Sequence, residues 1–177
     1  MKRMIAWILV FTGSLVLPLH AGKTAWRFSL KDIDGNPVIL DSLLQKGMVI
    51  LDFWATWCTY CDEELDLLND LQQQYPDQLT VVAISLDSPR TLSKIRSLRD
   101  ARGWQFLIVL DSHQTLKRKY RVFGLPTVFI IDQNGEILLT RQGYNPSQEE
   151  EFRKLIQQHL PPPSKDSLPS PSGSPAP

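Results

Sequence analysis

Residues 48–61 decide the fold, and they read Met-Val-Ile-Leu-Asp-Phe-Trp-Ala-Thr-Trp-Cys-Thr-Tyr-Cys. The first seven form a nearly continuous apolar run, which is typical of a strand covered on both faces of a sheet. Over residues 59–75 leucines recur at helical spacing, and Pro76 ends that run. The stretch therefore predicts a buried strand that turns at once into a helix, with Cys58 and Cys61 at the turn.

The elements expected around this stretch alternate between strand and helix. In chain order they are a strand pair at 28–30 and 38–40, a strand at 79–86, a helix at 88–102, a strand at 106–110, a helix at 112–120, a strand pair at 127–131 and 136–140, and a helix at 147–159. Each strand pair encloses a turn sequence that favours a hairpin, Asp34-Gly35 in the first and Asn134-Gly135 in the second. This order predicts an α/β fold with an N-terminal β-hairpin extension, in which an antiparallel pair ends an otherwise parallel, mixed central sheet with helices on both faces.

Composition and charge limit the classes of function. The 177 residues include 19 Lys and Arg against 19 Asp and Glu, so no basic field exists to hold phosphates and nucleic-acid binding has little support. The hydrophobic fraction of 42% is typical of one globular domain. The chain's two cysteines are too few for a disulfide-stapled scaffold and too close together for a long-loop staple. Chemistry is therefore expected from local residues, and first of all from this pair.

The two ends of the chain are expected to lie outside the fold. Residues 1–21 have the order of a secretory signal peptide, with Met1-Lys2-Arg3, an uncharged stretch, and a small residue at Ala21. The uncharged run at 4–19 is shorter than the roughly 20 residues that a helix needs to cross a bilayer. We expect cleavage after Ala21, with an uncleaved N-terminal membrane anchor as the alternative. Both place the rest of the chain outside the cytoplasm.

The C-terminal segment 161–177 holds seven of the 13 prolines and five serines. Such a segment cannot bury enough apolar surface to offset the entropy of ordering it, which predicts a disordered tail. The folded domain is therefore expected over residues 22–160.

The position of the two cysteines predicts thiol chemistry. A cysteine where a helix begins faces unpaired backbone N–H groups and the positive end of the helix dipole, and both favour the thiolate form. We expect Cys58 to be this reactive thiolate and Cys61, one turn further on, to stay shielded and protonated. Two intervening residues let a disulfide close across one turn, so the pair can cycle between dithiol and disulfide.

The segment from Asp52 to Cys61 resembles the active-site segment of thioredoxin-like proteins. Together with the leader and Phe28-Ser29-Leu30 it is most similar to the TlpA/ResA branch, which comprises extracytoplasmic bacterial thiol–disulfide oxidoreductases. The resemblance covers about residues 26–160. It implies a thioredoxin fold without a cofactor, a periplasmic location, protein substrates that carry disulfides or thiols, and an electron donor embedded in the membrane.

The segment at 123–127, Phe-Gly-Leu-Pro-Thr, is similar to the cis-proline loop of the same family. The resemblance implies that the bond between Leu125 and Pro126 is cis and that the loop faces the two sulfurs. A proline at the start of a strand also leaves the preceding backbone free to pair with an extended segment. Leu125 and Pro126 are therefore expected to contact the substrate.

Residues around the cysteines are expected to touch the substrate as well. Trp57 and Tyr60 should form an apolar rim around Cys58, which suits weak docking of a protein chain. The family usually has a proline directly before the second cysteine, whereas this chain has Thr59-Tyr60 there. These two positions tune the stability of the thiolate, so the redox potential and the direction of exchange are left open.

Two acidic residues are candidates for proton transfer. Asp52 lies within an apolar strand, where burial disfavours its anion, so its pKa is expected to rise and it could exchange a proton with Cys61. Glu64 resembles the acidic residue that ResA-type proteins place near their cysteines. The alternative for Glu64 is a solvated carboxylate in the first helical turn, favoured there by the helix dipole. Asp52 is preferred as the principal base.

The expected function is an exported protein-disulfide reductant that uses Cys58 and Cys61. A disulfide oxidase or isomerase of the same fold and a non-enzymatic partner-binding module are the alternatives, and a permanently closed structural disulfide is a third. A metal site is disfavoured, because His113 and His159 are the only histidines left after signal cleavage and both are interpreted as surface residues. The resemblance implies clients such as apocytochrome c or other secreted proteins.

Overall fold

The computed structural model describes residues 23–162 of the chain. The expected signal peptide and nearly all of the expected C-terminal tail lie outside the described residues. Within 23–162, no helix has both the length and the apolar character that crossing a membrane would need.

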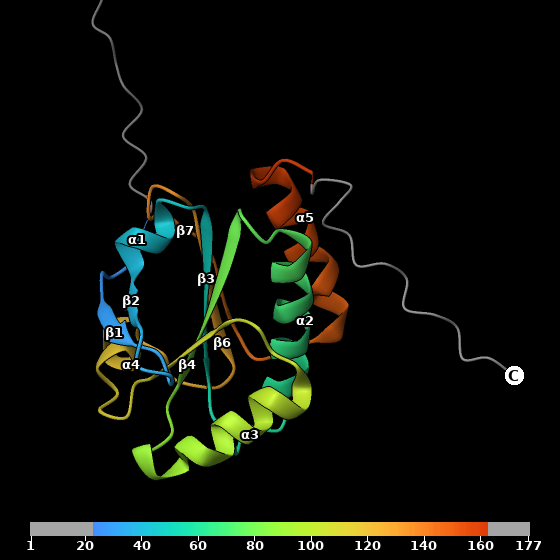
Figure 1. Ribbon diagram of the computed structural model, residues 1–177. Coiled ribbons are helices and arrows are strands. Elements are labelled where there is room, and N and C mark those ends of the chain that lie inside the picture. Colours follow the sequence, from blue (N-terminus) through green and yellow to red (C-terminus); the bar gives the residue numbers. More distant parts are fainter. Residues whose placement is uncertain (1–22, 163–177) are drawn as a thin grey trace, which may run out of the picture.

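A five-stranded mixed sheet forms the centre of the molecule, with strand order β5-β4-β3-β6-β7 (Figure 1). Its strands are β3 (Met48–Trp54), β4 (Leu79–Ser85), β5 (Leu107–Leu110), β6 (Thr127–Ile131) and β7 (Ile137–Gln142). β3 and β5 each run parallel to β4, whereas β6 runs antiparallel to both β3 and β7. The predicted mixed sheet with an antiparallel pair at one end is thus confirmed.

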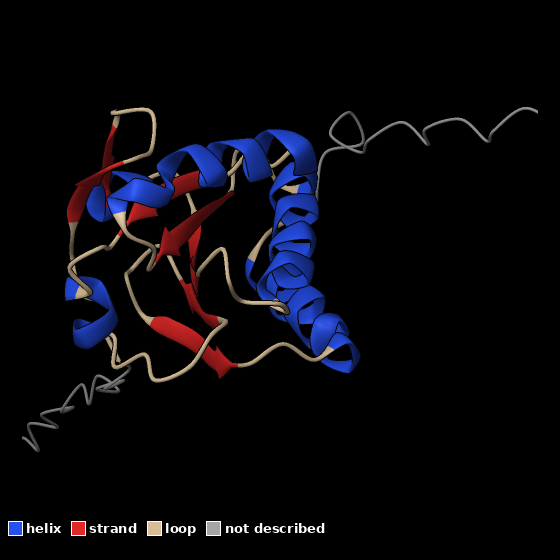
Figure 2. Cartoon of the chain, turned by 90° about the horizontal axis from the view of Figure 1, so that it is seen from below, coloured by secondary structure: helices blue, strands red, loops and turns tan. Residues whose placement is uncertain are grey.

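Helices cover both faces of this sheet. In the described part of the chain they are α1 (Leu40–Leu44), α2 (Cys61–Gln74), α3 (Leu92–Arg102), α4 (Thr115–Lys119) and α5 (Glu149–His159), with short 3-10 turns η1 (Pro89–Thr91) and η2 (Pro146–Gln148). The long helices α2 and α5 lie on one side, and α1 and α4 lie on the other together with the hairpin of β1 (Ser29–Lys31) and β2 (Pro37–Ile39) (Figure 1). Figure 2 shows the strands between these layers.

The strand β3 lies at the centre because both of its faces are buried. Successive side chains of a strand point to opposite faces. Ile50 and Trp54 join the apolar cluster beneath α2 and α5, whereas Leu51 and Phe53 join the cluster beneath α1 and α4. By this alternation Asp52 points to the face that α2 and α5 cover, and it is the polar interruption of a strand that is otherwise apolar.

The sequence prediction missed α1 and placed some helix starts too early. α1 has five residues, too few for an apolar periodicity to be seen. α4 begins at Thr115 instead of residue 112, because the carboxylate of Asp111 accepts hydrogen bonds from the backbone N–H groups of Thr115 and Lys117. A carboxylate that binds these N–H groups takes the place of intrahelical partners at the helix start.

Candidate active site

Cys58 and Cys61 are joined by a disulfide at the start of α2, with their Cα atoms 5.5 Å apart. Cys61 is the first residue of α2 and is fully buried, whereas Cys58 lies in the preceding turn and is partly exposed. The backbone N–H of Cys58 donates to the carbonyl of Ala55 over 3.0 Å, which closes this turn. Solvent therefore reaches Cys58, whereas Cys61 is closed off from it.

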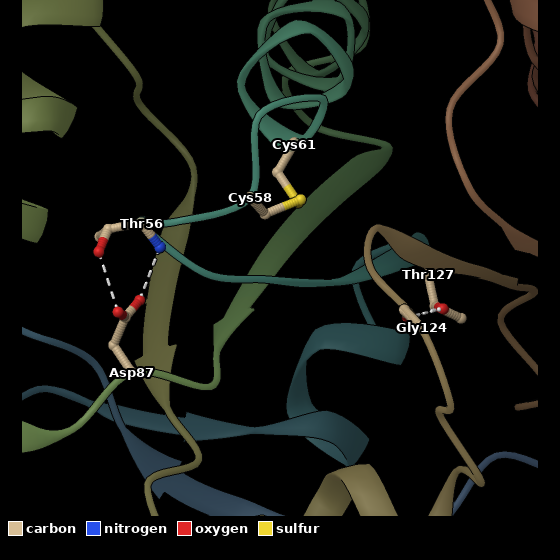
Figure 3. Close-up of a disulfide and its surroundings, with 6 residues drawn as sticks. All are labelled: Thr56, Cys58, Cys61, Asp87, Gly124 and Thr127. Atoms are coloured by element: carbon tan, nitrogen blue, oxygen red, sulfur yellow. Dashed lines mark hydrogen bonds between the residues drawn. A yellow bond between two sulfur atoms is a disulfide. The ribbon is translucent and has the colours of Figure 1, made fainter.

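A buried carboxylate holds the turn that carries Cys58. Asp87, two residues beyond β4, accepts hydrogen bonds from the backbone N–H and the hydroxyl of Thr56 at 2.8 and 2.9 Å (Figure 3). The hydroxyl of Ser85 donates to the same carboxylate at 2.8 Å, and Lys94 Nζ donates to the carbonyl of Thr56 at 3.1 Å. Sequence analysis missed Asp87. The available signal was a carboxylate just beyond a buried strand, at the sheet edge where the cysteines were expected.

The loop before β6 lies next to the cysteine turn (Figure 3). The peptide bond between Leu125 and Pro126 is cis, as the family resemblance implied. The hydroxyl of Thr127 donates to the carbonyl of Gly124 over 2.7 Å and closes this loop. The loop and the cysteine turn thus form one continuous surface.

A cavity of about 240 Å³ opens between these two segments. Trp57 lines it from the cysteine turn, Phe123 and Leu125 line it from the loop, and Lys117 lines it from α4. Its walls are therefore mainly apolar, with one cationic side chain. A cavity of this kind can take a side chain of a docked protein segment.

Large aromatic side chains are exposed on the cysteine turn and on the loop that shares a cavity with it. Trp57 is 70% exposed, Tyr60 is 64% exposed and Phe123 is 86% exposed, and Thr59 is exposed between the cysteines. Exposed apolar groups gathered at one place indicate an interaction surface. Trp57 and Tyr60 lie at the surface as expected, while sequence analysis did not assign Phe123 to it.

Two carboxyl groups are buried near the cysteines. Asp52 is fully buried and Glu64 is 1% exposed, so a solvated first-turn carboxylate, the alternative considered for Glu64, is wrong. Glu64 faces the sheet instead, and Nη2 of Arg141 donates to its Oε1 at 2.5 Å. Sequence analysis missed Arg141, because nothing local in β7 marks one of its residues as the partner of a residue 77 positions earlier.

Burial governs the proton affinity of both carboxyls. It raises the pKa of Asp52 well above its usual range, the nearby charge of Glu64 raises it further, and the charge of Arg141 opposes this. Burial also raises the pKa of Glu64, and the hydrogen bond and charge of Arg141 oppose that rise. The direction for Asp52 is the one expected from its place in an apolar strand. His113 and His159 are exposed, as interpreted from the sequence.

Comparison with known proteins gives a match to the AhpC/TSA family over residues 21–139. The thiol-disulfide oxidoreductase ResA of Bacillus thuringiensis (strain Al Hakam) is 33% identical over 120 residues, which cover 68% of either chain. The thioredoxin-like protein YneN of Bacillus subtilis (strain 168) is 35% identical over 120 residues, 67% of this chain and 69% of YneN. A Chlorobium tepidum crystal structure, named as a thiol:disulfide interchange protein DsbE, superposes with a TM-score of 0.71 and 32% identity, covering 78% of this chain and 96% of its own.

Proposed function

Because the chain belongs to the AhpC/TSA family and is a thiol–disulfide oxidoreductase of the ResA and DsbE type, we propose that it is an exported reductant of protein disulfides. The observation that carries this proposal is the pairing of a partly exposed sulfur, Cys58, with a fully buried one, Cys61, at the start of α2. Such a pair lets one sulfur capture a substrate and the other release it.

In the reduced protein, the Cys58 thiolate attacks one sulfur of a substrate disulfide. A bond forms between Cys58 and that sulfur, and the other substrate sulfur leaves with the electron pair and takes a proton from solvent. Cys61 then gives its proton to Asp52, and its sulfur attacks that of Cys58. The substrate leaves as its second thiolate, and the disulfide between Cys58 and Cys61 remains. The substrate has gained the two electrons that the protein has lost.

Several observations support a role for Asp52 as the proton acceptor. Asp52 lies on the sheet face covered by α2, whose first residue is Cys61, and it is fully buried. A carboxyl whose pKa burial raises holds and releases a proton closer to neutral pH than an exposed one does. Asp52 can therefore take up the proton that Cys61 loses when it resolves the mixed disulfide.

The substrate is proposed to dock on the surface formed by Trp57, Tyr60 and Phe123, with Thr59 at its centre. The cavity between Trp57 and Leu125 would take a substrate side chain, and the backbone beside Pro126 would pair with an extended substrate segment. These features suit exposed disulfides in secreted proteins, apocytochrome c among them, because a flat aromatic surface accepts many sequences weakly.

The location and the electron source follow from residues 1–21. Their resemblance to a signal peptide supports a periplasmic protein, either free or held by an uncleaved N-terminal anchor. Cytoplasmic electron carriers cannot reach such a protein, so we propose that a membrane-embedded donor reduces the disulfide after each cycle.

The proposal is tested by insulin reduction and by thiol alkylation of the reduced protein near neutral pH. We expect alkylation of Cys58 before Cys61, loss of insulin reduction in Cys58→Ser, and a trapped mixed disulfide with substrate in Cys61→Ser. Cys58→Ser that still supports the protein's function would indicate a non-enzymatic binding module. A reduction potential near about −270 mV against glutathione supports a reductant, whereas one near about −120 mV supports an oxidase and contradicts the proposed direction.

A further inference from the structure

Arg141 shares one rung of the central sheet with Asp52. Asp52 of β3 pairs with Val128 of β6, and Val128 pairs with Arg141 of β7. Residues directly opposite one another on paired strands point to the same face. Val128 packs in the cluster beneath α2 and α5, so Asp52 and Arg141 also face those helices. Glu64 approaches the same rung from α2.

Arg141 is held rigidly in this position. Its side chain is 10% exposed, and its guanidinium lies over the ring of Phe152 at 3.8 Å from the ring centre. Stacking on an aromatic face and a hydrogen bond to Glu64 fix the plane of the guanidinium. Arg141 therefore bonds to Glu64, whereas neither carboxyl oxygen of Asp52 has a hydrogen-bond partner within residues 23–162.

The rung holds one buried cation and two groups that can become anions. A charge removed from water is strongly unfavourable unless an opposite charge compensates it. Because Arg141 donates a hydrogen bond to Glu64, its positive charge compensates a negative charge on Glu64. A second anion on Asp52 would be repelled by Glu64, and no donor bonds to Asp52 in the structure even though Nε and Nη1 of Arg141 also have no partner among residues 23–162.

We propose that Arg141 is a positioning residue that holds Glu64 as the anion of this cluster and thereby leaves the exchangeable proton on Asp52. This inference rests on the proposed function, in which Asp52 exchanges a proton with Cys61. In the oxidised protein the proton lies on Asp52. When a donor thiolate reduces the disulfide by attacking Cys58, the Cys61 sulfur leaves with the electron pair and takes this proton. When Cys61 later resolves a substrate, the proton returns to Asp52.

Few other groups can compete for this role. The β4 and β6 members of the rung, Ala83 and Val128, do not titrate. Among the described residues, the charged groups that act on Asp52 are Glu64 of α2 and Arg141 of β7. Tyr144 lies near Glu64, and the carboxylates of Glu63 and Glu149 act on Tyr144 in turn.

The test follows the carboxyl carbons of ¹³C-labelled Asp and Glu by NMR during a pH titration of the oxidised protein, in which neither cysteine titrates. We expect Glu64 to be ionised at pH values where Asp52 is still protonated. Glu64→Gln should move the Asp52 midpoint to lower pH, because it removes the repelling charge and frees Arg141. Arg141→Met should move the Glu64 midpoint to higher pH, and Arg141→Lys should restore it in part.

A matched control is Arg102→Met. Arg102 also pairs with carboxylates of α2, Asp62 at 2.9 Å and Asp66 at 2.7 Å, but it is partly exposed to solvent. We expect this variant to leave the midpoints of Asp52 and Glu64 unchanged, because exposed charges are screened by water.

A double variant keeps the test decisive if Arg141→Met fails to fold. Glu64→Gln/Arg141→Met replaces the ion pair by neutral groups, and it should show a higher Asp52 midpoint than Glu64→Gln alone, because the attraction of Arg141 is gone. Equal midpoints in these two variants overturn the inference. So does a wild-type protein in which Asp52 ionises before Glu64.

The rate of insulin reduction shows whether a failed prediction concerns the role of Arg141 or the proposed function as a whole. We expect Arg141→Met to lower the rate of insulin reduction roughly tenfold at neutral pH and to alter the pH profile. This loss is smaller than the about 10²–10⁴-fold that a general acid–base group contributes itself, because Asp52 is still present. Arg141→Lys should recover most of the rate. A wild-type protein that does not reduce insulin counts against the proposed function alone, because the carboxyl titration does not depend on turnover. An unchanged pH profile in Arg141→Met counts against the role of Arg141 alone.

Discussion

The burial of Asp52 is unfavourable for folding but suits the proton exchange that we propose for it. It stands in a strand whose other positions are apolar and buried, and its carboxyl is fully buried without a hydrogen-bond partner among residues 23–162. Burying an unpaired polar group is unfavourable for the free energy of folding. Stability does not account for an aspartate at this position, whereas the proposed proton exchange with Cys61 gives its buried carboxyl a function.

This conflict predicts how stability depends on pH. Because burial raises the pKa of Asp52 in the folded state, the folded protein binds the proton more tightly than the unfolded chain does. The tighter proton binding by Asp52 adds to the free energy of unfolding. This contribution is complete below the unfolded-state pKa of about 3.9, and it is lost as the pH rises through the folded-state pKa. Relative to Asp52→Asn, the wild-type free energy of unfolding should fall by up to about 1.4 kcal/mol per pH unit in this window.

Urea unfolding of the wild type and of Asp52→Asn across a pH series measures how the difference between their free energies of unfolding changes with pH. Asp70→Asn, which changes an exposed carboxylate of α2, is the matched control and should give a curve parallel to the wild type. Parallel curves for Asp52→Asn and the wild type would show that Asp52 titrates alike in the folded and unfolded states.

At the scale of elements, the start of β3 depends on a close approach between two backbone segments. The N–H of Met48 donates to the carbonyl of Gln78, just before β4, over 2.8 Å. A Cβ on Gly47 would lie 2.0 Å from this same carbonyl oxygen. The neighbouring atom belongs to the backbone, so no side-chain rotation can relieve the overlap.

We therefore expect Gly47→Ala to lower the free energy of unfolding by about 3 kcal/mol or more, as strong overpacking does. The control is Gly103→Ala at the end of α3, where φ is 67° and no atom lies within 4 Å of the added Cβ. Its loss should be about 1 kcal/mol, from the left-handed backbone alone. Guanidinium unfolding of both variants compares the two losses, and equal losses would contradict a steric role for Gly47.

The element scale also shows where sequence patterns suffice. β3 was predicted with its observed bounds because seven buried positions in a row leave a strong apolar signal. The short α1 was missed because five residues provide barely one turn of periodicity. The hairpin turns were found because their Asp-Gly and Asn-Gly steps act locally.

At the scale of the whole molecule, the sheet separates two apolar clusters that pack different parts of the chain. The cluster beneath α2 and α5 surrounds Cys61 and lies on the face of the buried charges. The opposite cluster packs the N-terminal hairpin and α1 against the sheet through residues such as Phe28, Val38 and Leu40. The N-terminal extension thus packs mainly on the face away from Cys61, and of its described residues only Ile33 in its turn reaches the cluster that contains Cys61.

We expect Leu40→Ala, at a fully buried position of α1, to lower the free energy of unfolding by about 2–5 kcal/mol. The pH midpoint of Cys58 alkylation should not change, because the cavity would form on the opposite face of the sheet. Ile39→Ala, at a position 38% exposed, is the control and should have a small effect. A shifted alkylation midpoint in Leu40→Ala would show that the two clusters are coupled.

The sequence by itself determined the order of the strands and of every helix except α1, and it singled out the cysteine pair, Trp57, Tyr60 and the two acidic candidates. These depend on residues that lie a few positions apart, where the period of a helix or strand is enough to place them. Only the tertiary structure decided that Glu64 is buried against Arg141, that Asp87 holds Thr56, and that Phe123 stands beside Trp57. Those contacts depend on strand register and on the placement of α2 over the sheet, which result from packing of the whole core and leave no trace in local periodicity.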